Sequence, residues 1–336
     1  MKLEFQQKGP LKQEGHTEIP DTNALKSSIV IFLSRGIIHG GFPVAHNGAR
    51  HSMKWQGGEE SENVEDRRGS GIGPQHVAIG GVGTIAIIIL GLVMGVDPRQ
   101  LLQVVQQQAP QVNAGRNQQA ADDPEENQKA SFSKIIFRDT EVVWEDLFER
   151  MGRRYEKPIM VLYRDRVESA CGTAESAVGP FYCPGDARVY IDLGFYEDMQ
   201  RKLNSPGDFA RAYVIAHEVG HHVQRLLGYP PGQGQGRPSN KTSVRMELQA
   251  DYFAGVWAHH AQEKFKFLEA GDVETAMHAA FEIGDDRLQK KSRGYVVPDS
   301  FTHGTSKQRQ RWFMEGFQTG DVQGAKKLFT LREDEL

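Results

Sequence analysis

One stretch of the chain is continuously apolar, whereas apolar residues elsewhere recur at helix or strand spacing. Residues 77–96 (VAIGGVGTIAIIILGLVMGV) carry no charge and would span about 30 Å as a helix. This length matches the hydrocarbon core of a bilayer, so the pattern predicts a single transmembrane helix. A buried core helix is an alternative, but such helices seldom lack a polar face over this length. A cleaved signal peptide is a second alternative, and the length of the apolar run favours an uncleaved anchor instead.

The segments around this predicted span differ in composition. Residues 1–52 contain only a short apolar run, and we expect a disordered extension or a non-native one that results from an over-long gene model. Residues 53–76 are predicted to be a short cytoplasmic segment, because Arg67 and Arg68 favour the cytoplasmic side. The chain after the span would then lie outside the cytoplasm. Residues 97–131 are rich in Gln, Asn and Ala, which predicts a flexible linker.

Residues 132–336 have the mixed periodicities of a folded domain, which we predict to be α+β, mostly helical, with a small sheet. Apolar residues at helical spacing follow Asp139, which is placed to cap the helix that it precedes. Two short segments rich in β-branched and aromatic residues, 158–165 and 187–195, predict strands. Further helices are predicted at 205–228, 241–265, 272–291, 306–318 and 321–329.

Charge and cysteine content restrict the possible partners. The chain has 336 residues, with 40 Lys and Arg against 44 Asp and Glu, and a net charge of -4. Because no basic stripe is available for nucleic acid, we expect no nucleic-acid partner. Only two cysteines occur, Cys171 and Cys183. They are compatible with a single disulfide in an oxidising compartment or with two buried thiols.

The stretch AHEVGHHVQ, residues 216–224, concentrates histidines in one predicted helix. His217 and His221 are four residues apart, so both imidazoles can reach one metal ion from the same helical face. Glu218 lies beside this pair, where a carboxylate can act as general base toward a metal-activated water. A polar helix without metal is the alternative, although chance would produce this pattern on the order of 0.05 times in such a chain.

The next predicted helix contains ELQAD, residues 247–251, which supplies the missing ligand. Catalytic zinc usually has three protein ligands, and Glu247 is the natural oxygen donor. Asp251, one turn further, can accept a hydrogen bond from the outer nitrogen of a ligating histidine. An exposed acidic pair is the alternative. His222 is rotated about 100° from His221, so we expect it to lie beside the site or on the surface.

Three more sets of polar residues are candidates for supporting roles. His303 precedes a predicted helix start and could donate to an oxyanion, although a simple capping segment with a nearby histidine would look the same. Asp285 and Asp286 fit either a turn or a position behind the metal ligands. The pair 259–260 is interpreted as solvated or packing histidines.

Several motifs together resemble one known family. The stretches are KWQGGEESENVEDRRG, CGTAESAVGPFYCPGDARVYIDLGF, AHEVGHHVQ, RMELQADYFAGVWAH and IGDDRLQ...FTHGTSKQRQRWF. The ligand pattern resembles the gluzincin class of metallopeptidases, and the whole set resembles the putative neutral zinc metallopeptidase family of bacteria, from Met53 nearly to the end. The resemblance implies a zincin-like domain, an anchor in the bacterial inner membrane and a periplasmic active site, but no particular substrate. His303 and Arg309 are spaced as in prenyl-protease and heat-shock membrane protease families, although Gly304 replaces their usual proline.

The sequence therefore predicts a membrane-anchored zinc metallopeptidase that hydrolyses a peptide or protein substrate with a zinc-activated water. The bilayer would be contacted through residues 77–96, and one zinc ion would bind per chain. The predicted roles are metal ligation by His217, His221 and Glu247, general base catalysis by Glu218, oxyanion donation by His303 and support by Asp251 and Arg309. The strand VYIDLGF, 189–195, could offer a peptide substrate an open edge, and an ordinary core strand is the alternative. A tethered peptide-binding or assembly factor with a structural metal, and a zinc hydrolase of non-peptide amides, are the alternatives.

Overall fold

The computed structural model describes residues 53–69, 123–175, 179–201, 207–231, 239–287, 295 and 301–336. The predicted transmembrane helix at 77–96, the extension at 1–52 and most of the predicted linker lie outside these ranges. Within them, no helix has the length and apolar content needed to cross a membrane.

The described residues form a mostly helical α+β domain with a small sheet, which confirms the predicted class. The strands are β1 (Val64–Asp66), β2 (Ile159–Tyr163), β3 (Arg166–Ser169), β4 (Gly172–Glu175), β5 (Phe181–Cys183) and β6 (Arg188–Asp192). The α-helices are α5 (Pro124–Arg150), α6 (Gly194–Arg201), α7 (Asp208–Leu227), α8 (Asn240–Phe265), α9 (Asp272–Glu282) and α11 (Ser306–Thr319), and the 3-10 helices are η4 (Val322–Phe329) and η5 (Glu333–Glu335).

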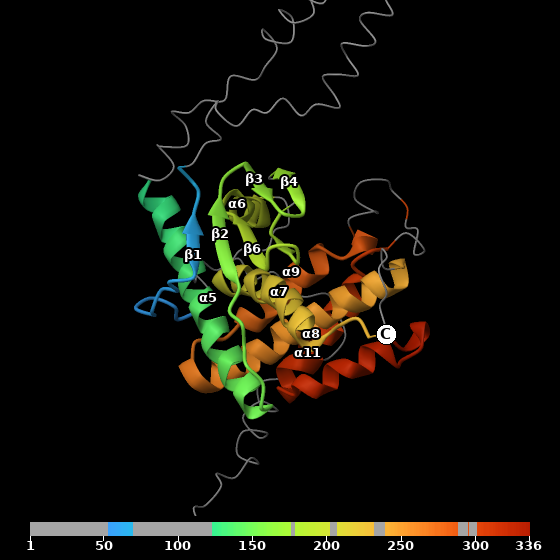
Figure 1. Cartoon of the computed structure of the whole chain (residues 1–336). Helices are drawn as coiled ribbons and strands as arrows, with labels where there is room; N and C mark the ends of the chain where they lie inside the picture. The colour runs from blue at the N-terminus through green and yellow to red at the C-terminus, as the bar shows by residue number, and fades with distance from the viewer. Residues whose placement is uncertain are drawn as a thin grey trace, which may run out of the picture. The chain divides into compact units, whose positions relative to one another are not determined.

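The main sheet has the strand order β1-β2-β6-β5, in which only β5 runs antiparallel to its neighbour. Its two faces bury different clusters, since successive strand residues point to opposite sides. Met160 and Leu162 pack in the large core that the helices share. Val161 and Tyr163 face a smaller cluster under the β3–β4 hairpin, which lies at the top of Figure 1.

The edge strand beside α7 is β5, so the prediction that β6 is the edge is wrong for the described sheet. β6 lies between β2 and β5, and Val189, Tyr190 and Ile191 are fully buried. The residues of β6 are apolar on both faces because both faces of the strand are covered. This pattern does not show whether a strand lies at the edge or in the centre of its sheet.

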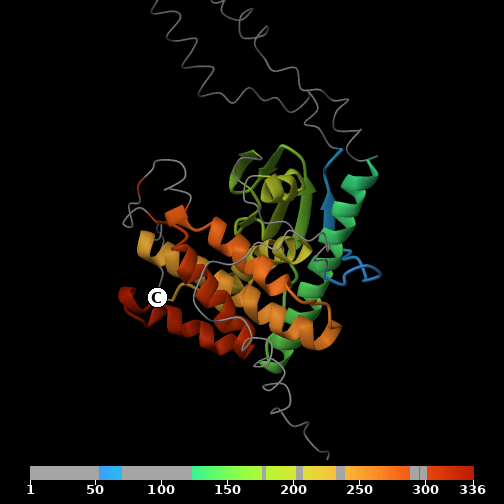
Figure 2. The ribbon, with the colours of Figure 1, turned by 180° about the vertical axis from the view of Figure 1, so that it is seen from behind.

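Helices α7, α8 and α11 pack closely enough that glycine is required where they cross. A Cβ atom added to Gly220 of α7 would lie 2.9 Å from the Ala250 carbonyl oxygen of α8. In the same way, a Cβ atom at Gly255 of α8 would clash with the backbone of α11, and one at Gly316 of α11 would clash with the backbone of α8. The glycine within HEVGH therefore lets α8 approach the histidine-bearing helix, and Figure 2 shows α8, α9 and α11 gathered on that side of the domain.

The first helix of the domain begins earlier than the sequence pattern predicted. α5 starts at Pro124, and the side chain of Asp123 caps it by accepting from the Glu125 amide. Asp139, the predicted cap, lies in the middle of α5. Residues 124–131, which were predicted to belong to the flexible linker, are helical because this Asp-Pro start signal outweighs their polar composition.

Residues 53–69 belong to the same domain as the helices, so the prediction that they form a segment separate from the domain is wrong for the described part of 53–76. β1 pairs in parallel with β2, and Met53 is buried in the main core. The Trp55 indole donates to Asp208 at 2.9 Å, and Arg68 donates to the Glu126 carbonyl at 3.0 Å. Figure 1 shows this blue segment along α5. Residues 53–69 must therefore lie on the same side of any membrane as the helical domain.

Candidate metal centre

The two histidines of the HEVGH motif face one point, as their spacing predicted. They lie on α7, whose apolar residues are buried on both flanks and which ends at Gly228 in a left-handed cap. The imidazole rings of His217 and His221 have centroids 4.9 Å apart. Both side chains are largely buried, at 8% and 19% exposure. The single helical turn between them thus presents two nitrogens to a common position.

Glu247 from α8 completes this set of donors. Its Oε2 atom lies 3.3 Å from His217 Nε2 and 3.7 Å from His221 Nε2. Ligands about 2.0–2.2 Å from one tetrahedral ion are separated by roughly 3.3–3.6 Å, so the three atoms fit a single zinc ion. Burial lowers the pKa of His217, but Asp251 and Glu247 raise it to about 10. The strong preference for a cation at this position agrees with the donor chemistry.

The outer nitrogens of both histidines are already engaged. His217 Nδ1 donates to Asp251 Oδ1 at 2.8 Å, and His221 Nδ1 donates to Gln224 Oε1 at 2.9 Å. In the neutral rings that a metal ion would bind, these bonds leave both Nε2 atoms with lone pairs toward Glu247, the arrangement typical of ligating histidines. Gln224 was not predicted from sequence, although its position three residues after His221 on the same helix is a usable signal.

Asp251 lies at the centre of a buried network that connects α7, α8 and α11. Arg309 donates to both carboxylate oxygens of Asp251, at 2.8 and 3.0 Å, and Tyr213 donates to Oδ1. Burial by itself would raise the pKa of Asp251, but Arg309 and His217 lower it to about 2. The charged carboxylate therefore orients His217. Arg309 lies at the site, as the sequence predicted. The role of Tyr213 was not predicted from the sequence.

His303 is held in its loop by Asp285. The backbone amides of Thr302 and His303 each donate to Asp285 Oδ2 at 2.6 Å, and His303 Nδ1 lies 3.3 Å from Oδ1. The hydrogen bond to Asp285 raises the pKa of His303, and the charge of Glu247 adds to this shift. Asp286 instead accepts from the Ser306 amide at the start of α11. Asp285 thus positions the His303 loop, and Asp286 positions the start of α11. The sequence had left the roles of both aspartates open.

Glu218 is buried beside the ligands, with 8% of its surface exposed. Burial lowers the pKa of His221, but the carboxylates of Glu247 and Glu218 contribute to a net rise. The charge of Glu218 therefore acts on His221, as the charge of Glu247 does.

His222 is buried at 1% exposure and does not join the metal ligands. Its Nε2 donates to the Glu156 carbonyl at 2.6 Å, and its Nδ1 accepts from the Tyr182 hydroxyl at 3.0 Å. Burial lowers the pKa of His222 to about 4. The neutral ring thus ties α7 to β5 and to the segment after α5. Of the two positions expected for His222, beside the site or on the surface, the surface position is wrong.

This lowered pKa predicts a pH-dependent contribution to stability. Because the unfolded value is 6.5, the neutral ring stabilises the fold above pH 6.5, and the stabilisation is lost as pH falls through about 4. We expect the stability advantage of the wild type over His222→Gln to shrink by roughly 3 kcal/mol between pH 7 and pH 4. Urea unfolding in the presence of a chelator measures it, and an advantage that is independent of pH would contradict the assignment.

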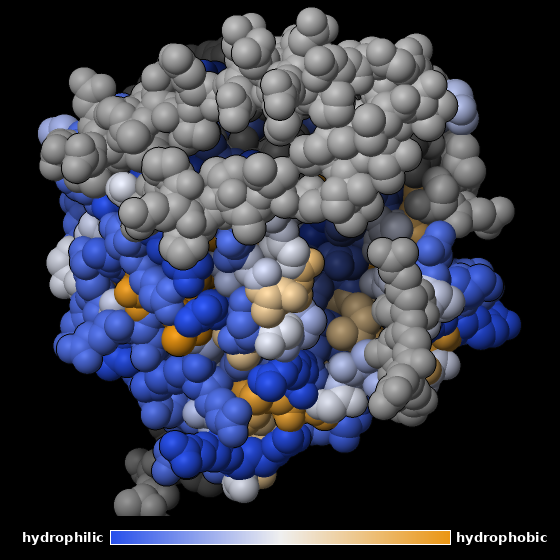
Figure 3. All heavy atoms as spheres, turned by 45° about the horizontal axis from the view of Figure 1, so that its top comes forward, coloured by the Kyte–Doolittle hydropathy of each residue, from blue (hydrophilic) through white to orange (hydrophobic). Residues whose placement is uncertain are grey.

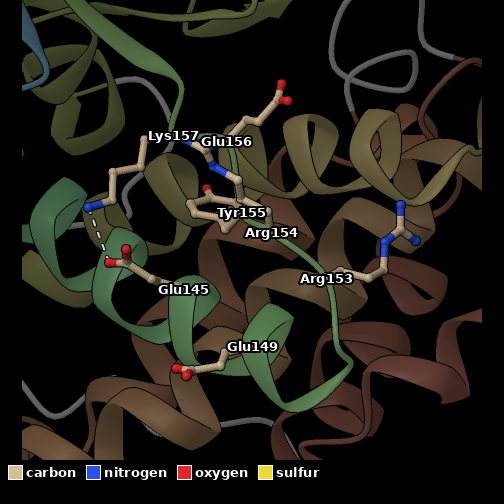
Figure 4. Close-up of a pocket in the computed structure, with 7 residues that line it drawn as sticks. All are labelled: Glu145, Glu149, Arg153, Arg154, Tyr155, Glu156 and Lys157. Carbon is tan, nitrogen blue, oxygen red and sulfur yellow. Dashed lines mark ion pairs between the residues drawn. The ribbon is translucent and has the colours of Figure 1, made fainter.

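A charged depression lies where α5 ends, away from the metal ligands. Figure 4 shows Glu145 and Glu149 of α5 opposite the segment that runs from Arg153 to Lys157. Acidic and basic side chains compensate one another there, and Lys157 pairs with Glu145 at 3.1 Å. The depression thus carries no net charge that would select a ligand.

The two cysteines form a disulfide in the structure. Cys171 follows β3 and Cys183 ends β5, and their Cα atoms are 5.8 Å apart. The bond joins the β3–β4 hairpin to the edge strand of the main sheet.

An α+β domain with two helix-borne histidines, an adjacent glutamate and a carboxylate from the next helix defines a protein of the HExxH metal-site class. The family model described as "putative neutral zinc metallopeptidase" matches residues 53–327, so the chain belongs to this family and the resemblance noted in the sequence is confirmed.

Relatives of the chain occur in Escherichia coli and in Mycobacterium species. The uncharacterized protein YpfJ of Escherichia coli (strain K12) is 50% identical over 285 residues, which cover 80% of this chain and 96% of that protein. An uncharacterized protein of Mycobacterium tuberculosis (strain H37Rv) is 43% identical over 192 residues, covering 54% of this chain and 64% of its own length. No solved structure matches the chain.

Proposed function

We propose that the protein is a zinc-dependent peptidase with a gluzincin-like site. The observation that carries the proposal is the convergence of His217 Nε2, His221 Nε2 and Glu247 Oε2, each pair close enough to share one ion. A buried glutamate beside them supports catalysis rather than a purely structural role, because a structural zinc normally fills all four positions with protein ligands and needs no base.

The residues around the ion have different roles in the proposed hydrolysis. Zinc bound there supplies a Lewis acid that lowers the pKa of a water molecule and polarises the scissile carbonyl. Glu218 takes a proton from the attacking water and delivers it to the leaving amine. Asp251, held by Arg309, keeps the His217 lone pair directed at the ion. His303 donates to the oxyanion that develops on the carbonyl oxygen.

The edge of β5 offers a place for an extended peptide. β5 is the last strand in the order of the main sheet and contacts α7, which carries the ligands. A substrate strand added there would make backbone hydrogen bonds to residues 181–183. A structure with a bound peptide inhibitor that lies elsewhere would remove this part of the proposal.

Metal removal tests the proposed activity directly. We expect the purified protein to cleave a casein-type substrate, to lose this activity with a chelator, and to regain it when zinc chloride is added back. Elemental analysis follows the zinc content at each step. Cleavage that persists in metal-free protein would exclude the proposal, and so would zinc-loaded protein that cleaves neither casein nor a proteome-derived peptide mixture.

His303→Ala tests the oxyanion donor. Loss of a single such donor is expected to lower kcat about 100-fold or more with little change in KM, because the hydrogen bond forms fully only in the transition state. Steady-state kinetics on a fluorogenic peptide measure the effect. An unchanged kcat, or a loss confined to KM, would assign His303 to the loop structure alone.

We also propose that residues 77–96 attach the protein to the bacterial inner membrane with the domain in the periplasm, where the Cys171–Cys183 disulfide would persist. Because residues 53–69 and the helical domain fold together, a single crossing by residues 77–96 is incompatible with the fold, and in this proposal the segment enters and leaves the bilayer on one side. An impermeant maleimide should label Glu59→Cys and Asp334→Cys alike in intact spheroplasts. Labelling of one position alone would exclude this topology.

The described residues in Figure 3 form a mainly hydrophilic face with separate small apolar patches, as expected for a domain outside the bilayer.

A further inference from the structure

A second group of potential ligands lies further along α8, away from the HEVGH centre. His259, His260 and Glu263 place one ligand atom each within 4.8 Å of one another. His259 Nε2 lies 3.6 Å from Glu263 Oε1, and His260 Nδ1 lies 3.3 Å from Glu263 Oε2. Asp251 of the first centre is eight residues earlier on the same helix, about 12 Å along its axis. We refer to these three residues as the His259 cluster.

Both imidazoles of the His259 cluster use their other nitrogen to bind the end of α11. His259 Nδ1 donates to the Phe317 carbonyl at 2.8 Å, and His260 Nε2 donates to the Gly320 carbonyl at 2.9 Å. A neutral imidazole has one N–H, so these bonds fix both tautomers. The remaining nitrogens carry lone pairs toward Glu263, as they do in ligating histidines whose outer N–H meets a carbonyl.

A divalent cation between these nitrogens and the carboxylate would use both lone pairs and balance the charge of Glu263. One nitrogen lies 3.6 Å from Glu263 Oε1 and the other lies 3.3 Å from Glu263 Oε2, so the two carboxylate oxygens together face both imidazoles. The ring centroids of His259 and His260 are 4.9 Å apart, so the two imidazoles lie side by side. One divalent ion could therefore be shared by both rings and the carboxylate.

The surroundings hold the cluster in this arrangement. Gly320 has a positive φ of 60°, and a Cβ atom there would lie 2.5 Å from the His259 ring. Glycine is thus needed both for the end of α11 and for the approach of this imidazole. The histidine side chains are 17% and 16% exposed and Glu263 is 42% exposed, which leaves access for an ion from solvent.

We propose that the His259 cluster binds a second divalent metal ion, zinc or a metal with similar preference for imidazole and carboxylate. All three ligands lie on α8, and the ion would fix the two imidazoles that bind the carbonyls at the end of α11. Two imidazoles and one carboxylate suit zinc, with the fourth position open to water. The site is separate from the proposed peptidase centre and does not depend on its activity.

Calorimetric titration of the metal-free, full-length chain with zinc chloride tests the second site. We expect two zinc ions per chain in the wild type, one in Glu263→Gln and one in Glu247→Gln. Loss of the Glu263 carboxylate should weaken the second binding event by at least about 100-fold while peptidase activity at saturating zinc is retained. Glu274→Gln, an exposed change on α9, is the matched control and should keep both events.

The stoichiometries of the variants separate the possible outcomes. One zinc in the wild type that Glu263→Gln retains would overturn the proposal and leave the cluster as a cap on α11. Two zinc ions in both the wild type and Glu263→Gln would also overturn it, because the second ion would then lie elsewhere. His260→Gln should reproduce the loss seen with Glu263→Gln, and circular dichroism verifies that each variant is folded.

Discussion

Glu218→Gln is expected to retain zinc and to lose peptidase activity by about 100- to 10,000-fold. Glutamine preserves the size of the buried side chain but cannot accept a proton from the attacking water. The proposed ligands, His217, His221 and Glu247, are unchanged. Kinetics on a fluorogenic peptide, together with elemental analysis of the same sample, therefore distinguish a missing base from a missing metal.

The matched control for this substitution is Glu149→Gln, an exposed glutamate near the end of α5. It should leave both kcat and zinc content unchanged. Wild-type cleavage by Glu218→Gln would remove the glutamate from the mechanism. Parallel loss of zinc and activity would show that Glu218 holds the metal, which contradicts its assignment as a base.

Arg309→Met is expected to reduce the free energy of unfolding by roughly 3–5 kcal/mol. Arg309 and Asp251 are 3% and 0% exposed, and the guanidinium contacts both carboxylate oxygens. Methionine fills similar space but leaves the Asp251 charge buried without its main partner. Because Asp251 also orients His217, the variant should bind zinc more weakly as well.

Thermal unfolding of the metal-free protein measures the stability loss without a contribution from zinc. A decrease in Tm on the order of 10 °C is expected for a domain of this size. Arg311→Met is the control, because that side chain lies on the same helix and is exposed. Equal effects of the two substitutions would show that the buried ion pair contributes nothing specific.

The two histidines of the candidate metal centre could be predicted because helical spacing alone sets their geometry. Positions four apart on one helix share a face, so His217 and His221 required no knowledge of the fold. Glu247 and Asp251 also share a face, but their distance from the histidines depends on the α7–α8 crossing. Gly220 makes that crossing close, and its significance is visible only in three dimensions.

Contacts between distant parts of the sequence could not be predicted in the same way. The pairing of β1 with β2 joins residues almost 100 positions apart, across the segment predicted to be a membrane span. The sequence of residues 53–69 is charged and polar, as in a disordered terminal segment. Likewise, only the fold reveals that Asp285 accepts the amides of the His303 loop.

The boundary of α5 shows how one local signal can override another. The Gln- and Asn-rich composition around 120–131 favours a linker, whereas Asp123 followed by Pro124 is a helix start. The helix forms because Ala130 and Phe132 are buried in the core. The sequence alone does not show which residues cover them.

The most direct test of the proposed centre is an anomalous difference map at the zinc edge from crystals of the zinc-loaded protein. We expect a peak about 2.0–2.2 Å from His217 Nε2, His221 Nε2 and a Glu247 carboxylate oxygen. A zinc ion bound without Glu247, or no peak between the two imidazoles, would contradict the metal centre from which the proposed hydrolysis follows.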